Sequence, residues 1–125
     1  MTAQASAPTI LVVDDNADAA DSLALILDLE GYRTVVAYDG RSALSSIERG
    51  SPAAILLDIG LPDIDGLEVA RRARQQFPER RLLIVALSGH GSPEDRDAAR
   101  SAGCDGHLVK PVDPGVVIEL LQQRL

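Results

Sequence analysis

The 125-residue sequence has few aromatic residues, one cysteine and no long apolar run. Its aromatics are Tyr32, Tyr38 and Phe77, so the core must be aliphatic, and the interleaved rings that stack on single-stranded nucleic acid are missing. The single cysteine, Cys104, excludes an internal disulfide and a multi-cysteine metal site, and we interpret it as a small buried thiol. No segment approaches the roughly 20 apolar residues of a membrane span, so we expect no membrane insertion.

Positive charge is also scarce, because 12 lysine and arginine residues stand against 19 acidic ones and give a net charge of -7. Affinity for nucleic acid depends on neutralising phosphates, so this acidity argues against DNA or RNA binding and fits cation binding. The opening residues, MTAQASAPT, lack the basic and apolar regions of a secretory signal, so we expect a cytoplasmic protein. We interpret residues 1–8 as a flexible tail and 9–125 as one domain.

What the sequence does contain is a regular alternation of two kinds of segment. The first kind is a short apolar run rich in valine, isoleucine and leucine, which is typical of a parallel strand covered on both faces. Periodicity alone does not separate such runs from buried helix, so their alternation with longer segments carries the argument. The runs occupy 9–13, 33–38, 53–58, 82–88 and 106–110.

The longer segments are amphipathic and predict helices. In 18–30 the apolar residues follow the i, i+3, i+4 and i+7 spacing of one helix face: Ala20, Leu23, Ala24 and Leu27. Gly31 follows as a stop, and the other helices are expected over 40–49 (before Gly50), 66–77, 92–103 and from 113 onward. Five strand–helix pairs predict an α/β fold, a five-stranded, parallel, doubly wound, flavodoxin-like (βα)5 sheet with strand order 2-1-3-4-5.

Polar residues stand at the carboxyl ends of four of these strands, where ligands bind in doubly wound sheets. They are Asp14, Asp15, Asp58, Ser88 and Lys110. Three neighbouring carboxylates repel one another and need a counter-charge, and oxygen ligands with room for water suit Mg²⁺. A carboxylate beside Mg²⁺ can attack a phosphoryl group, while a lysine and a hydroxyl stabilise the charge on the transferring oxygens.

Each of these residues also has a structural interpretation. One of the two aspartates before residue 16 could cap the first helix, which begins near residue 18. Asp58 and Asp63 could form turns around Pro62, and Lys110 could be a solvated charge before a loop. Their joint position at one edge of the predicted sheet favours phosphoryl chemistry.

The motifs VVDDN, LLDIGLPDIDG, ALSG and LVKPV resemble, in type, order and spacing, those of the receiver domain of response regulators in two-component signalling. The resemblance covers residues 9–125. It implies that Asp58 is the phosphoacceptor, that Asp15 binds Mg²⁺ directly and Asp14 through water, and that the backbone carbonyl of Gly60 is the third protein ligand.

The resemblance further implies that Lys110 pairs with Asp58 and then with the phosphoryl oxygens, that Ser88 moves toward the phosphoryl group, and that the Lys110–Pro111 bond is cis. The phosphoryl donor would be a phosphohistidine of a sensor histidine kinase or phosphotransfer domain. The output would be a surface formed by the fourth helix, fifth strand and fifth helix, which binds a partner or a second copy. Such a domain promotes its own phosphorylation and hydrolysis and has no separate substrate.

Three positions near this site depart from the family pattern or flank the phosphate. His107 stands three residues before the lysine, where receivers usually have Tyr or Phe, so we hypothesise a weakened or pH-dependent switch; the alternative is a plain surface histidine. Gly60 offers no side chain to shield the phosphate. His90 could orient a hydrolytic water, so we predict a phosphoryl lifetime that is sensitive to His90.

Other functions fit the sequence less well. A haloacid-dehalogenase-like phosphohydrolase needs acids two residues apart after the first strand, whereas DDNAD places them at 14, 15 and 18. No glycine-rich loop follows that strand, which argues against a flavin or dinucleotide site. A phosphorylation-independent docking domain stays open, as does the choice between a stand-alone receiver and one excised from a longer chain. LDIGLP and HLVKPVDP most resemble receivers attached to hybrid sensor kinases.

Overall fold

Five apolar runs form a parallel sheet in the computed structural model, which describes residues 7–125. The strands are β1 (Thr9–Val13), β2 (Arg33–Ala37), β3 (Ala54–Asp58), β4 (Leu83–Ser88) and β5 (Gly106–Val109). They lie in the order β2-β1-β3-β4-β5, with every neighbouring pair parallel. The predicted architecture and strand order are confirmed, whereas most of the predicted tail lies outside the described residues.

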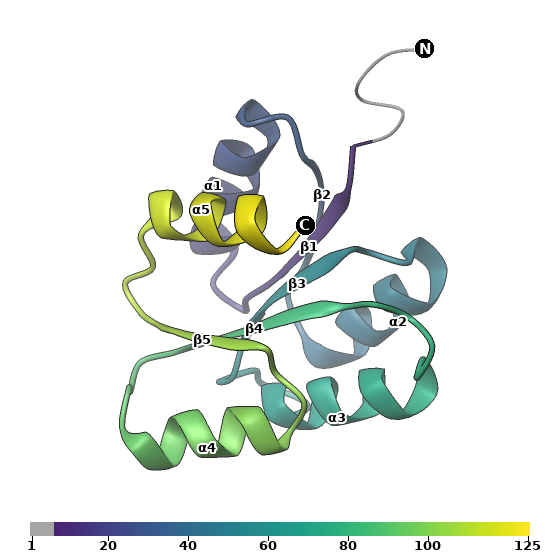
Figure 1. The fold of residues 1–125 in the computed structure, drawn as a ribbon, viewed down its shortest axis with the longest axis vertical. Coiled ribbons are helices and arrows are strands. Elements are labelled where there is room, and N and C mark those ends of the chain that lie inside the picture. The colour runs from purple at the N-terminus through teal and green to yellow at the C-terminus, as the bar shows by residue number, and fades with distance from the viewer. Residues whose placement is uncertain (1–6) are drawn as a thin grey trace.

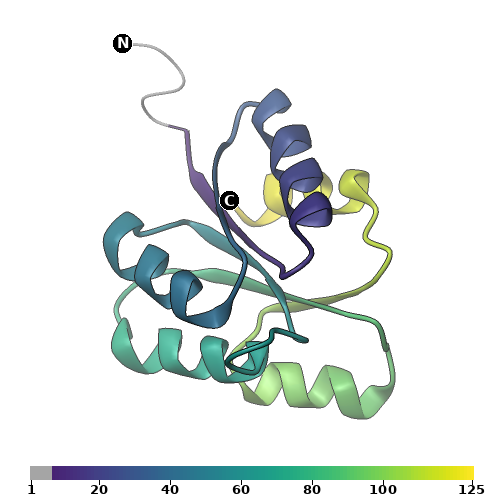
Figure 2. The ribbon, with the colours of Figure 1, turned by 180° about the vertical axis from the view of Figure 1, so that it is seen from behind.

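The helices alternate with the strands and cover both faces of the sheet. They are α1 (Ala17–Leu29), α2 (Gly40–Gly50), α3 (Gly66–Gln76), α4 (Pro93–Ser101) and α5 (Pro114–Arg124). Figures 1 and 2 show α1 and α5 on one face and α2, α3 and α4 on the other. Within residues 7–125, no helix combines the length and the apolar character that crossing a membrane requires.

The two layers explain why the strand sequences are continuously apolar. Every residue of β3 and β4 is buried, and successive side chains alternate between the two cores. Ile55 and Leu57 pack in the cluster under α2, α3 and α4, whereas Leu56 packs in the cluster under α1 and α5. Cys104 belongs to the first cluster, and burial raises the pKa of its thiol to about 11, which confirms the interpretation of a buried thiol.

The structure corrects two interpretations of where helices begin and end. Asn16, and neither aspartate before it, caps α1, because its side chain accepts the Ala19 N–H. Helix α2 runs through Gly50, and the residue that adopts the left-handed conformation is Ser51, with φ of 44°. Gly31 does have positive φ, as expected of a residue that stops a helix.

Asp63 has a structural task that the sequence analysis missed. Rather than only closing a local turn, its carboxylate accepts the N–H groups of Gly40 at 2.8 Å and Arg41 at 3.0 Å, at the start of α2. The hydrogen bond from Gly40 is the main reason that the pKa of Asp63 is lowered. This contact ties the β3–α3 loop, which follows Asp58, to a neighbouring helix.

The first residue of α3 also fixes this loop, because Gly66 lies against the backbone that follows β3. Its N–H donates to the Ile59 carbonyl at 2.9 Å. A Cβ atom at this position would lie 2.7 Å from the Ile59 Cα and closer still to the Asp58 carbonyl oxygen. Only glycine therefore allows α3 to begin so close to Asp58.

We expect Gly66→Ala to lower the free energy of unfolding by about 1–3 kcal/mol, because rigid backbone must shift to admit the methyl group. Gly50→Ala is the matched control, since a Cβ there meets nothing within 4 Å and alanine favours the helix. The control should leave stability unchanged or raise it slightly. Urea denaturation measures both variants, and equal losses would contradict the close-approach argument.

Candidate functional site

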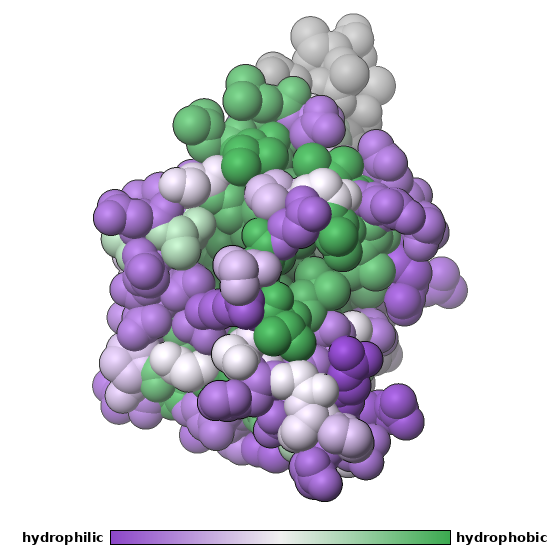
Figure 3. Space-filling view, turned by 90° about the vertical axis from the view of Figure 1, so that its left-hand side faces the viewer, coloured by the Kyte–Doolittle hydropathy of each residue, from purple (hydrophilic) through white to green (hydrophobic). Residues whose placement is uncertain are grey.

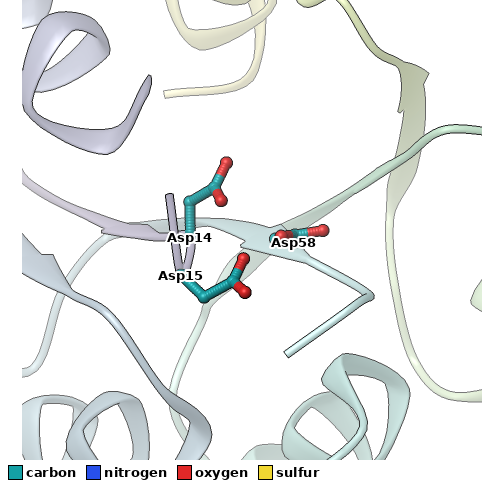
Figure 4. A group of neighbouring side chains, drawn as sticks. All are labelled: Asp14, Asp15 and Asp58. Carbon is teal, nitrogen blue, oxygen red and sulfur yellow. The ribbon is translucent and has the colours of Figure 1, made fainter. Parts of the chain in front are cut away.

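Three carboxylates meet where β1 and β3 end. Asp14 and Asp15 follow β1, Asp58 is the last residue of β3, and these two strands are neighbours in the sheet. Figure 4 shows the three side chains grouped at these strand ends. One oxygen of each lies within 4.8 Å of the others; Asp14 and Asp58 are buried, and Asp15 is exposed.

Lys110, which follows β5, supplies the counter-charge that the sequence predicted. Its Nζ lies 3.1 Å from Asp58 Oδ2 and 3.2 Å from Asp14 Oδ2. Its backbone N–H donates to the Ser88 carbonyl at 2.7 Å, which holds the end of β5 against β4. The Lys110–Pro111 peptide bond is cis, as the resemblance implied.

The electrostatics of Asp58 and Lys110 follow from burial and from this pairing. Burial raises the pKa of Asp58; the Gly60 N–H at 3.1 Å and Lys110 oppose this effect without cancelling it, and Asp14 adds repulsion. Burial alone lowers the pKa of Lys110, but its hydrogen bonds to Asp58 and Asp14 outweigh it, so the pKa is raised. The lysine therefore stays charged at neutral pH and is the cation on which the buried acids depend.

This group of residues fits a hard divalent cation. All the side-chain donors are carboxylate oxygens, and the exposed position of Asp15 leaves one side open to water. Three carboxylates against one lysine also leave negative charge uncompensated. The carbonyl of Gly60 as a further ligand stays a prediction.

Ser88 ends β4 beside this cluster, and its hydroxyl is held by neighbours other than Asp58. Its Oγ lies 2.6 Å from the His90 carbonyl oxygen and 2.7 Å from His107 Nε2. His107 is thus partly buried and faces Ser88, so the interpretation of it as a plain surface histidine is wrong. The side chain of His90 is exposed. From the sequence, the Ser88–His107 contact could be anticipated only in that the predicted strand order makes their two strands neighbours.

An apolar cavity of about 330 Å³ adjoins the cluster between α1 and the β5–α5 loop. It shares Asp14 and Lys110 with the cluster. Its other walls are mostly apolar: Ala19, Leu23, Ile26, Leu87, Val112 and Pro114. Figure 3 views the molecule from the left-hand side of Figure 1, where the β5–α5 loop lies. It shows apolar side chains gathered in the upper half, where α1 and α5 lie.

A family model described as the response regulator receiver domain matches residues 10–122. The chain belongs to this family. Receiver domains are signalling modules that histidine kinases phosphorylate, and their acidic pocket binds Mg²⁺. Membership in this family argues against the phosphohydrolase alternative.

Relatives of this receiver include proteins of similar and of greater length. An "Uncharacterized 14.6 kDa protein in sodA1 3'region" of Leptolyngbya boryana is 40% identical over 114 residues, or 91% of this chain and 87% of that protein. The transcriptional regulatory protein PrrA of Mycobacterium tuberculosis is 40% identical over 106 residues, or 85% of this chain and 45% of PrrA. The chain thus spans about half the length of such regulators. Its resemblance to receivers of hybrid kinases stays a prediction.

Solved receiver structures share the whole fold. The CheY-like receiver domain protein of Methanospirillum hungatei JF-1 has a TM-score of 0.86 and 32% identity, covering 94% of this chain and 92% of that chain. Chemotaxis protein CheY4 of Vibrio cholerae has a TM-score of 0.89 and 29% identity, and the match covers 95% of this chain and 99% of that chain. The similarity therefore extends over the site and over both faces of the sheet.

Asp58→Asn is expected to raise the free energy of unfolding at neutral pH in the absence of divalent cations. The folded state holds the Asp58 pKa above its ordinary value of 3.8, so it binds the proton more tightly than the unfolded chain does. Wild-type stability therefore falls as the pH rises through the folded-state pKa. The gain in the variant should be full above that pKa and vanish below the ordinary value, which urea denaturation across pH measures.

Asp105→Ala is the control, because this carboxylate supports the fold. It lies 2.8 Å from Arg74 Nη2 and accepts the Ile84 N–H at 2.9 Å. The control should lose stability at neutral pH. A comparable loss in Asp58→Asn would show that the Asp58 carboxylate also stabilises the fold, contrary to our account.

Proposed function

We propose that this receiver accepts a phosphoryl group on Asp58 from a phosphohistidine of a sensor histidine kinase or phosphotransfer domain, and that this switches a partner-binding surface. The observation that supports it most is the placement of Lys110 within 3.2 Å of both Asp58 and Asp14 in a three-carboxylate cluster. A lysine held against two buried acids is ready to pair with an incoming phosphoryl oxygen.

The residues of the chain would share the reaction as follows. A carboxylate oxygen of Asp58 forms the bond to phosphorus while the bond from phosphorus to the donor imidazole breaks, and its electron pair returns to that ring. Lys110 shifts its hydrogen bond from the carboxylate to a phosphoryl oxygen, and Ser88 donates to another. Asp15, Asp58, the Gly60 carbonyl and, through water, Asp14 would hold Mg²⁺, which offsets charge on the transferring oxygens.

Two surfaces suit the two partners. The apolar cavity beside Lys110 suits the donor, because it shares Asp14 and Lys110 with the cluster and a helix bound there would bring its histidine to Asp58. The surface of α4, β5 and α5 suits the output partner or a second copy. It exposes Val109 on β5, one residue before Lys110, and Val116 on α5.

We propose that Gly60 and His90 set the lifetime of the phosphoryl group, because both are exposed next to Asp58 or Ser88. We expect His90→Ala to change the dephosphorylation rate several-fold, since loss of the imidazole alters how water is held at the loop. The decay of the phosphorylated form, followed by intact mass, measures the rate. An unchanged rate would remove His90 from this role.

The function itself is tested by incubation with acetyl phosphate, with and without Mg²⁺, followed by intact mass. We expect one Mg²⁺-dependent phosphoryl adduct on the wild type, none on Asp58→Asn and a strongly reduced level on Lys110→Ala. Asp39→Asn, an acid that caps α2 and does not belong to the three-carboxylate cluster, is the control and should be modified like the wild type. Absence of an adduct and of beryllofluoride binding on the wild type would favour the docking-domain alternative.

A further inference from the structure

We propose that His107 is a positioning residue, whose Nε2–H holds the Ser88 hydroxyl in a resting position from which it must be released before it can bind a phosphoryl oxygen. The proposal rests on the role of Ser88 in the proposed function. It concerns a feature of this chain, a hydrogen-bonding imidazole where the family usually has a Tyr or Phe ring.

The direction of the hydrogen bonds follows from the single proton of the serine hydroxyl. The His90 carbonyl oxygen, 2.6 Å away, can only accept, so the proton of Ser88 Oγ lies toward it. Oγ must then accept from His107 Nε2, which lies 2.7 Å away. His107 Nε2 therefore carries a proton, and the tautomer of the ring is determined by its neighbours.

The other ring nitrogen has no partner that would hold a second proton. Among residues 7–125, His107 Nδ1 is buried and has no hydrogen-bond partner. A second proton there would create a buried cation with an unpaired N–H, which costs more than an unpaired lone pair. The surroundings do not favour that charge either, because Arg96 and Arg100 of α4 line a cavity of about 150 Å³ together with His107.

Within residues 7–125, the one carboxylate that lines this cavity, Asp105, already has hydrogen-bond partners. It pairs with Arg74 at 2.8 Å and accepts the Ile84 N–H. The remaining titratable group, the Cys104 thiol, has a raised pKa and stays neutral. Among the described residues that line this cavity, none therefore offers a free carboxylate to the His107 ring.

Release of Ser88 carries a cost that follows from this geometry. To donate to a phosphoryl oxygen on Asp58, the hydroxyl must move its proton away from the His90 carbonyl and take Oγ away from His107. The His107 Nε2–H then loses its acceptor inside the protein, and an unpaired buried donor is unfavourable. A phenylalanine ring has no donor to lose. His107 thus stabilises the resting arrangement and weakens binding of a phosphoryl group or its analogue.

The test compares beryllofluoride affinity in Mg²⁺ for wild type, His107→Phe and His107→Gln. We expect His107→Phe to bind about fivefold more tightly, the factor that corresponds to one neutral hydrogen bond. His107→Gln should stay close to the wild type, because its amide N–H can replace Nε2–H. In a Ser88→Ala background, His107→Phe should change nothing. An unchanged affinity, or an equal gain without Ser88, would overturn the proposal.

A second readout needs no ligand and separates this proposal from the proposed function. NMR of ¹⁵N-histidine-labelled protein, assigned with a His90→Gln variant, should show His107 neutral at neutral pH, with Nε2 protonated and Nδ1 bare. The opposite tautomer or an imidazolium would overturn the hydrogen-bond assignment. If the wild type shows the expected tautomer but binds no beryllofluoride, the proposed function fails while the Ser88–His107 bond stands.

Discussion

The ion pairs that Lys110 makes with Asp58 and Asp14 are the interaction on which the rest of the site depends. Two buried carboxylates beside a third acid would be unfavourable without a cation, and Lys110 is within 3.2 Å of both. The lysine follows β5, which lies two strands away from β3 and Asp58, so its side chain reaches the cluster along the shared edge of the sheet. The same contact explains why the pKa of Lys110 is raised although burial alone would lower it.

Asp63 and Asp105 on the one hand and Asp58 on the other differ in what their carboxylates do for the fold. Asp63 and Asp105 accept backbone N–H groups or pair with an arginine, so their carboxylates join separate parts of the fold. Asp58 is held with a raised pKa, which means that its charge is unfavourable in the folded state. A fold that needed only stability would gain nothing from this arrangement. Because the charge of Asp58 is unfavourable in the folded state, binding of a cation or a phosphoryl group relieves its repulsion with Asp14.

The sheet and the location of the site could be predicted from the sequence because both depend on simple patterns. Continuous apolar runs predicted five parallel strands, and the residues that end these strands had to share one edge. The three inner strands β1, β3 and β4 are buried on both faces, whereas the edge strands β2 and β5 are partly exposed. Contacts that depend on close approach could not be predicted. Asp63 reaches Gly40 across 23 positions, and Ser88 meets His107 only because two side chains turn toward each other. The left-handed Ser51 was missed because Gly50, beside it, is the residue that usually adopts that conformation.

The central claim is that Asp58 is the residue that carries the phosphoryl group. The most direct measurement is to treat the protein with acetyl phosphate and Mg²⁺, reduce the acyl phosphate with borohydride, and map the resulting homoserine by peptide mass spectrometry. Our account predicts homoserine at position 58 and at no other aspartate, and none when Mg²⁺ is chelated. Homoserine at 14 or 15 with none at 58 would contradict the assignment of the phosphoacceptor.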